Sequence, residues 1–347
     1  MRCSEGVPDG LEARDEAPFR GSSASGVWIA RMTCGNDGSS RILILAVVAC
    51  VGTVVTTTER LMDPLRPAPR TPQRQVVGDL RLHELRSHVF NNVRSLRVLV
   101  PDRYDAEENQ ARRYPVLYLN DGQNLFDPTT SVLNPMEWHV DETVHALATV
   151  GRIPPLIVVG IDSAGRRGRF KEYFPYVDQY LRPPEPDPQG KHYPAFLVDE
   201  VIPFIETRYR VQREVTSRGL GGSSAGALAA LYAVVTRPGA FGRLLIESPS
   251  IYVDDAHILR DAAGVVSWPD RIYLGAGTNE SGRPACDAAD KSEPELVRDV
   301  RRFERVLRDA RVDAARIRVV VTPCAVHNEA AWGARLPEAL AFLYGRE

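Results

Sequence analysis

The alternation of short apolar runs with longer segments of helical spacing is the feature that most restricts the fold of this 347-residue chain. Past residue 75, several runs are apolar at consecutive positions, which is typical of strands covered on both faces. Such alternation predicts an α/β fold, with a mostly parallel central sheet and helices on both faces. We expect strands at residues 96–101, 114–121, 155–162, 243–248, 271–277 and 316–321, and helices at 140–150, 196–209, 225–235, 295–310 and 332–344.

The N-terminal residues differ in composition from the rest of the chain. Residues 1–60 show no strand or helix periodicity apart from the apolar run ILILAVVACVGTVV at 42–55, so we assign them as an unstructured segment. Residues 61–75 are rich in proline and arginine and are typical of an extended linker. We therefore expect a single folded domain at 76–347.

The apolar run at 42–55 follows Arg41 and is shorter than the about 20 residues that cross a membrane, but it suits the core of a secretory signal. It predicts export. A cleaved signal, an uncleaved anchor that attaches the chain to a membrane, and a lipoprotein modified at Cys50 all remain open. Met32 would place the run nearer the usual distance from a start, so we expect Met32 to be the true start, with Met1 as the alternative.

The charge balance argues against a nucleic-acid partner. The chain carries 43 Lys and Arg against 45 Asp and Glu, a formal net charge of −2. Its one compact basic cluster is RRGRFK at residues 166–171. We expect a solvated loop there, with contact to an anionic substrate as the alternative.

Residues 222–226, GSSAG, fit the pattern G-x-S-x-G of a nucleophile elbow, a sharp turn from strand to helix. Of the two serines, only Ser224 has a glycine two residues before it, Gly222, and two after it, Gly226. Side chains at those positions would collide with the neighbouring backbone. The pattern predicts Ser224 as a nucleophile, and a tightly packed turn is the alternative.

A serine nucleophile needs a base and an acid that orients the base, and in hydrolases of this type they follow the serine in the order acid, histidine. His327 follows the last expected strand and is the favoured base, while His257 lies in a helical segment. Glu280 comes shortly after the strand at 271–277 and is the favoured acid, with Asp287 as the alternative.

The negative oxygen that forms during attack needs at least two hydrogen-bond donors. One is the backbone N–H of Ala225, directly after the serine. The other should come from the loop after an earlier strand, where YLNDGQNLFD places Gln123. We expect Gly122 to allow the turn that directs the Gln123 N–H to the serine.

These residues resemble the esterase D-like family of α/β-hydrolases, which includes feruloyl esterases, siderophore esterases, S-formylglutathione hydrolases and mycolyltransferases. The resemblance implies the α/β-hydrolase fold, with Ser224 as nucleophile, Glu280 as acid, His327 as base and Gln123 as an oxyanion donor. It covers almost the whole expected domain, through the pieces RYPVLYLNDGQNLFD, GRRGRFKEYFPY, GLGGSSAGALAALYAVVTRPGAFGRLLIESPS, GTNE and HNEAAWGARLPEALAFLY.

Past residue 75 the only cysteines are Cys286 and Cys324, one near Glu280 and one near His327. In an exported protein this favours a disulfide, with two separate buried thiols as the alternative. We expect no metal, since no histidine or cysteine cluster has ligand spacing.

The sequence as a whole predicts an exported serine esterase that hydrolyses a small-molecule ester through an acyl-enzyme, without a cofactor. The alternatives are an acyltransferase with the same triad and a non-catalytic binding protein on the same fold.

Overall fold

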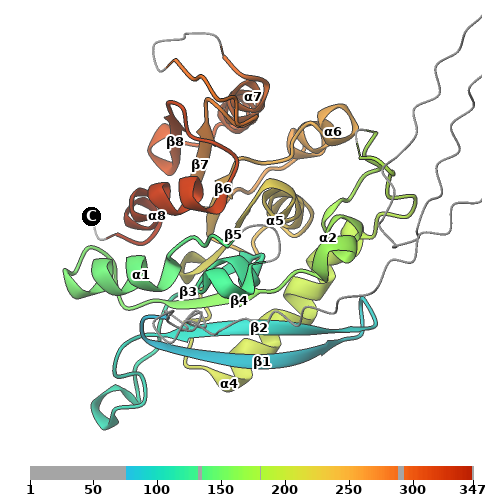
Figure 1. The fold of residues 1–347 in the computed structure, drawn as a ribbon. Coiled ribbons are helices and arrows are strands. Elements are labelled where there is room, and N and C mark those ends of the chain that lie inside the picture. The colour runs from blue at the N-terminus through green and yellow to red at the C-terminus, as the bar shows by residue number, and fades with distance from the viewer. Residues whose placement is uncertain (1–75, 132–134, 180, 288–292, 346–347) are drawn as a thin grey trace, which may run out of the picture. The chain divides into compact units, whose positions relative to one another are not determined.

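The computed structural model describes residues 76–131, 135–179, 181–287 and 293–345 (Figure 1). The expected unstructured segment, the apolar run at 42–55 and the linker lie outside these residues. Within the described ranges, none of the helices combines the length and the apolar character that a membrane crossing requires.

The core of the fold is an 8-stranded sheet in the order β1-β2-β4-β3-β5-β6-β7-β8. Strand β2 runs antiparallel to both of its neighbours, β1 and β4. The other strands, β3 to β8, all run parallel to one another. The predicted α/β class with a mostly parallel sheet is confirmed. The strands are β1 Asp79–Ser87, β2 Asn92–Val100, β3 Val116–Asn120, β4 Ile157–Ile161, β5 Arg218–Ser223, β6 Arg243–Glu247, β7 Arg271–Gly277 and β8 Ile317–Thr322.

Helices cover both faces of the sheet (Figure 1). Helices α1 and α8 pack together on one face, over a cluster of buried side chains that includes Leu117 and Leu340. The other face is covered by helices packed around α5, all of whose residues from Ala225 to Val235 are buried. The helices are α1 Val140–Thr149, α2 Gly165–Tyr173, α3 Tyr193–Ala195, α4 Ile202–Arg208, α5 Ser224–Thr236, α6 Val253–Ala262, α7 Glu295–Asp309 and α8 Glu329–Tyr344.

The central strands are apolar at consecutive positions because neither of their faces meets water. Every residue of β3 and β4 is buried, and the side chains alternate between the two layers of helices. Parallel strands end at a common edge of the sheet, so the loops after β3, β5, β7 and β8 meet there. Those loops carry the residues that the sequence singled out.

Three features differ from the sequence-based expectations. Strand β1 was not expected. The basic cluster at 166–171 lies in helix α2, so the expectation of a solvated loop is wrong. The expected helix at 196–209 is divided into a π-helix at Phe196–Val201 and α4, and Pro203, which has no N–H, lies at the start of α4.

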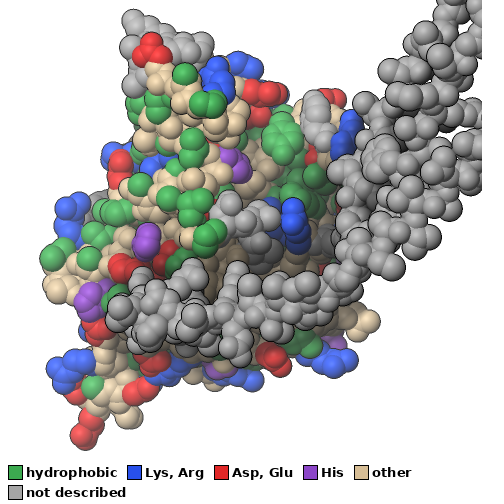
Figure 2. Space-filling view, in the orientation of Figure 1, with side chains coloured by type: hydrophobic (Ala, Val, Ile, Leu, Met, Phe, Trp, Pro, Cys, Tyr) green, Lys and Arg blue, Asp and Glu red, His purple; other side chains and the backbone are tan. Residues whose placement is uncertain are grey.

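On the face shown in Figure 2, acidic and basic side chains of the described residues are interspersed, without a large patch of one charge. This distribution agrees with the net charge of −2.

Candidate active site

Ser224 lies at the sharp turn from strand to helix. Strand β5 ends at Ser223, and α5 begins at Ser224, whose φ of 55° is in the left-handed region that side chains seldom adopt. A Cβ on Gly222 would lie 2.9 Å from the carbonyl carbon of Gly226, and a Cβ on Gly226 would lie 2.9 Å from an oxygen of Asp121. Backbone therefore leaves no room for a side chain at position 222, and the side chains of Asp121 and Asn120 leave none at 226.

His327 and Glu280 lie together at the ends of the two neighbouring strands β8 and β7. Nδ1 of His327 is 2.7 Å from Oε2 of Glu280. The other oxygen of Glu280 accepts hydrogen bonds from the Gly277 amide at 2.6 Å and from the Ser248 hydroxyl at 2.7 Å. The glutamate is thus fixed from three sides, and it fixes one edge of the imidazole ring.

The environment of Glu280 favours its ionised form. Burial of the carboxyl disfavours the charge, but the hydrogen bonds from His327, Ser248 and the Gly277 amide, together with the charge of His327, outweigh it and lower the pKa of Glu280. A carboxylate at this position orients the imidazole and stabilises it when it becomes positively charged.

Ser224 and His327 line the same cavity, whose volume is about 350 Å³. Helix α2 and the loop after β3 form other parts of its wall. Its lining residues are Asp121, Gln123, Asn124, Ser163, Arg166, Arg169, Phe170, Ser223, Ser224, His327, Glu329 and Trp332. The predicted nucleophile, base and oxyanion residue Gln123 therefore border one space.

The loop after β3 turns at Asp121, where φ is 58°, so the expectation that Gly122 provides the turn is wrong. Glycine is needed at 122 for another reason: a Cβ there would lie 2.5 Å from the backbone of Gly160 on β4. The next residue, Gln123, is buried, and its carbonyl accepts a hydrogen bond from the Thr130 hydroxyl at 2.6 Å.

Arg169 and Asp121, which both line the cavity, form an ion pair. This pair was not predicted from the sequence. Nε and one Nη of Arg169 lie 2.8 and 2.7 Å from the two oxygens of Asp121. Burial lowers the pKa of Arg169, but the carboxylate of Asp121 more than compensates, so that the pKa is raised overall. This two-bond contact joins α2 to the turn after β3.

Asn120 is a second residue that the sequence analysis missed. Its side-chain amide donates a hydrogen bond to the Gly226 carbonyl at 2.7 Å and accepts one from the Tyr193 hydroxyl at 2.6 Å. Asn120 is the last residue of β3. In the sequence, the polar residue that directly follows the apolar run at 116–119 could have indicated it. It ties the end of β3 to the first turn of α5.

The two alternatives weighed for the base and the acid lie elsewhere. His257 is 2.7 Å from Asp254 and stacks on Tyr176 with a centroid distance of 4.3 Å, and it is not among the residues that line the cavity. Asp287 is exposed and lies at a separate cavity beside Cys286. Of the two carboxylates, Glu280 is the one that contacts His327.

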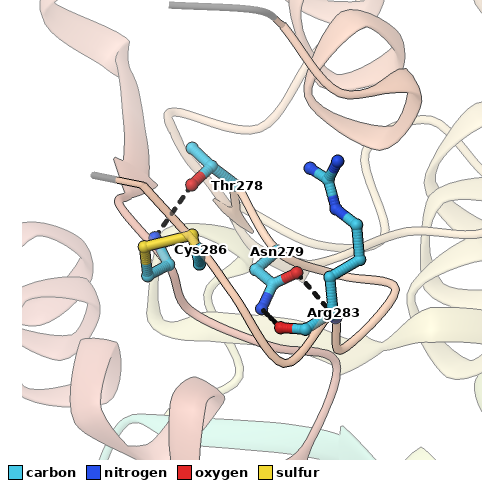
Figure 3. The surroundings of a disulfide bond; sticks show 5 residues. Thr278, Asn279, Arg283 and Cys286 are labelled. Atoms are coloured by element: carbon cyan, nitrogen blue, oxygen red, sulfur yellow. Dashed lines mark hydrogen bonds between the residues drawn. A yellow bond between two sulfur atoms is a disulfide. The ribbon is translucent and has the colours of Figure 1, made fainter. Parts of the chain in front are cut away.

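Cys286 and Cys324 are joined by a disulfide, with a Cα–Cα distance of 5.7 Å (Figure 3). The Cys324 amide also donates a hydrogen bond to the Thr278 hydroxyl at 2.8 Å. The bond links the loop that carries Glu280 to the loop that carries His327.

Metal ligands do not gather at the cavity in the part of the chain that the structure describes. The one group of His, Cys, Asp and Glu side chains found there with a suitable arrangement is Glu137, His139 and Glu142, none of which lines the cavity.

The comparison with known proteins identifies a family. Over residues 87–343 the chain matches the family model described as "Putative esterase". It is 24% identical to the uncharacterized protein YbbA of Bacillus subtilis over 76% of this chain and 96% of that protein. It is 31% identical to the siderophore enterobactin esterase of Emericella nidulans, over 44% of this chain and 51% of that protein. It is 28% identical to the ferri-bacillibactin esterase BesA of Bacillus subtilis over 48% of this chain and 60% of that protein.

Solved structures share the fold. The BES protein from Bacillus cereus superposes with a TM-score of 0.61 at 17% identity, over 81% of this chain and all of that one. The siderophore hydrolase EstB from Aspergillus nidulans gives a TM-score of 0.57 at 19% identity, over 80% of this chain and 98% of that one. The chain therefore belongs to the "Putative esterase" family of α/β-hydrolases, among relatives that include siderophore esterases.

Proposed function

We propose that the protein is a serine esterase in which Ser224 is the nucleophile, His327 the general base and Glu280 the acid of the triad. One observation carries the proposal. His327, which lies 2.7 Å from Glu280, lines the same cavity as Ser224, whose backbone is in the left-handed conformation. A pair of this kind activates a serine hydroxyl, and an elbow presents it.

In the first half of the reaction, the Nε2 atom of His327 takes the proton of the Ser224 hydroxyl while Oγ bonds to the ester carbonyl carbon. The carbonyl oxygen becomes negative and accepts hydrogen bonds from the amides of Gln123 and Ala225. The bond from carbon to the alcohol oxygen then breaks, and His327 gives its proton to the departing alcohol. The acyl group remains on Ser224.

In the second half, His327 takes a proton from water as the water oxygen bonds to the acyl carbon. The same two amides hold the negative oxygen. The bond to Ser224 Oγ breaks, His327 returns the proton to the serine, and the carboxylic acid leaves. Throughout, Glu280 holds Nδ1 of His327 so that Nε2 is the atom that exchanges protons.

The proposed substrate is a small-molecule ester. Two relatives are named as esterases of the siderophores enterobactin and ferri-bacillibactin, so esters of this class are the first to test. A cavity of about 350 Å³ lies in the range of small-molecule sites.

We also propose that the chain is exported. The apolar run at residues 42–55 and the bond between Cys286 and Cys324 support this, since disulfides persist in oxidising compartments. Cell fractionation with N-terminal sequencing of the mature product tests it. A product that begins at Met1 in the cytosol would refute it.

The esterase proposal is tested by Ser224→Ala, with the adjacent Ser223→Ala as the matched control. We expect Ser224→Ala to reduce hydrolysis of p-nitrophenyl acetate by at least about 1,000-fold with an unchanged melting temperature, and Ser223→Ala to retain most of the activity. A fluorophosphonate probe should label the wild type and not Ser224→Ala. Full activity of Ser224→Ala would exclude this serine from the mechanism.

Two further outcomes address the alternatives. Transfer of the acyl group to an added alcohol in preference to water would identify an acyltransferase. A wild-type protein that neither hydrolyses esters nor reacts with the probe would be a binding protein on this fold.

A further inference from the structure

A second cluster of ionisable side chains lies apart from the cavity, where the chain enters helix α1. Glu137 and His139 precede the helix, and Glu142 lies in its first turn. One ligand atom from each of the three lies within 4.8 Å of the others. Nδ1 of His139 is 3.5 Å from an oxygen of Glu137 and 3.6 Å from an oxygen of Glu142.

Glu137 is the unusual member of this cluster. Its side chain is 3% exposed, and its Oε2 has no hydrogen-bond partner, although an unpaired buried carboxylate is costly. Oε2 of Glu142 is also buried without a partner. Over the described ranges, neither carboxylate forms an ion pair with Lys or Arg.

Other buried carboxylates of this protein are held by arginine or, as at Asp127 and Glu329, by neutral hydrogen-bond donors. Asp121 is paired with Arg169, and Glu247 with Arg335. Glu172 is paired in the same way with Arg94. Oε2 of Glu137 has neither kind of partner, so a cation from outside the chain would compensate it.

We propose that Glu137, His139 and Glu142 bind a divalent transition-metal ion of the zinc type. For bonds of about 2.1 Å, the ligand atoms of a tetrahedral ion lie about 3.4 Å apart. The separations of 3.5 and 3.6 Å from His139 Nδ1 to the Oε1 atoms of Glu137 and Glu142 are close to this spacing, and the three ligand atoms all lie within 4.8 Å of one another. An imidazole with two carboxylates favours such an ion over Ca²⁺ or Mg²⁺, which prefer oxygen ligands alone. Water would take the fourth position, since the imidazole side of the cluster is exposed.

The backbone conformation at His139 allows the side chains of Glu137, His139 and Glu142 to converge. His139 has a left-handed conformation, with φ 54° and ψ 46°, directly before α1. This turn brings His139 between Glu137, two residues earlier, and Glu142, three residues later. In the sequence, the spacing E-x-H-x-x-E does not by itself indicate a metal site, because it contains a single histidine.

The ion would stabilise the loop after β3 without touching a substrate. The Trp138 amide, between two of the ligands, donates a hydrogen bond to the Asn124 carbonyl at 3.1 Å. The Val140 amide donates one to the Leu125 carbonyl at 3.1 Å. The Trp138 ring packs on Trp332 with a centroid distance of 5.8 Å. The proposal is independent of the esterase proposal, because its readout is metal binding.

The experiment uses the full chain, stripped with EDTA, and zinc chloride as the probe. We expect one equivalent of zinc to remain bound through gel filtration, measured by mass spectrometry of the metal, and to raise the melting temperature. His139→Ala and Glu142→Gln should each weaken zinc binding at least tenfold, as measured by calorimetry. Both side chains are partly exposed, so these variants should fold.

The matched control is His145→Ala, on the same helix, whose exposed imidazole lies 2.9 Å from Asp102. It should bind zinc as the wild type does. Glu137→Gln should abolish binding without lowering the melting temperature of the metal-free protein, because the amide has the same shape and Oε2 of Glu137 has no hydrogen-bond partner to lose. The proposal is overturned if the wild type retains no zinc, if His139→Ala binds it equally well, or if an equal concentration of Ca²⁺ displaces it.

Discussion

Trp332 donates a hydrogen bond from its indole nitrogen to the Ser248 hydroxyl oxygen at 2.9 Å, and Ser248 in turn donates its proton to Glu280. Ser248 thus holds the proposed triad acid from behind. Ser248→Ala removes one bond to a charged group, which is worth about 1.5 kcal/mol, so we expect kcat for an ester to fall about tenfold with little change in KM. Steady-state kinetics with p-nitrophenyl acetate measures it.

Trp332→Phe is the companion variant. It keeps an aromatic ring beside His327 but removes the indole N–H, and the bond from Ser248 to Glu280 remains. We expect kcat to stay within about threefold of the wild type. An equal loss of kcat in both variants would show that Ser248 does not act through Glu280.

The lowered pKa of Glu280 predicts how stability depends on pH. Because the folded-state value lies below the ordinary value of about 4.3, the bonds to Glu280 stabilise the fold above that pH and are lost as pH falls through the folded-state value. Urea unfolding of the wild type and Glu280→Gln should therefore show a gap in unfolding free energy at pH 7 that closes below about pH 4. Glu84→Gln, at an exposed carboxylate, should show no such gap.

Gly226→Ala should disrupt the elbow. The added Cβ would lie 2.9 Å from Asp121 and 3.1 Å from Asn120, both of which are buried and held by other contacts. We expect a loss of about 1–3 kcal/mol of unfolding free energy and a fall in ester hydrolysis. Gly264→Ala is the control, since its nearest contact would be at an ordinary 3.6 Å. Equal effects of the two substitutions would contradict the close approach.

Arg335→Met should destabilise the protein strongly. Arg335 on α8 binds both oxygens of Glu247, and both side chains are at most 4% exposed. Removing the guanidinium leaves a buried carboxylate without a partner, which costs about 3–5 kcal/mol. Arg318→Met breaks an exposed pair with Glu338 on the same helix and should cost at most about 1 kcal/mol. Chemical denaturation measures both, and the double variant Glu247→Gln with Arg335→Met should recover part of the loss.

The strands that are buried on both faces could be predicted from the sequence, and the edge strand β1 could not. Residues 116–119 and 157–161 are apolar at consecutive positions because helices cover both sides. Strand β1 pairs with one neighbour only and leaves Leu82 58% exposed, so charged residues interrupt its pattern. Its position is set by pairing with β2, which the local sequence does not encode.

The candidate site divides in the same way. Ser224, Glu280 and His327 each follow a strand in the expected order, and the structure brings Glu280 to His327, while their catalytic roles stay a prediction. The partners that fix the site could not be predicted, because each contact joins distant segments: Ser248 to Glu280, and Arg169 to Asp121. Helix α2 has two glycines and no apolar stripe, so nothing in the sequence indicated which of its arginines points inward.

The bond between Cys286 and Cys324 also limits the unfolded chain. Glu280 and His327 are 47 residues apart, a reach of about 160 Å in a fully extended chain. With the disulfide formed, Glu280 and His327 are separated only by residues 280–286, the disulfide and residues 324–327. Their greatest distance therefore falls to about 40 Å. Refolding with this disulfide intact would therefore begin with Glu280 and His327 confined to a small part of that range, which shortens the search by which their contact re-forms.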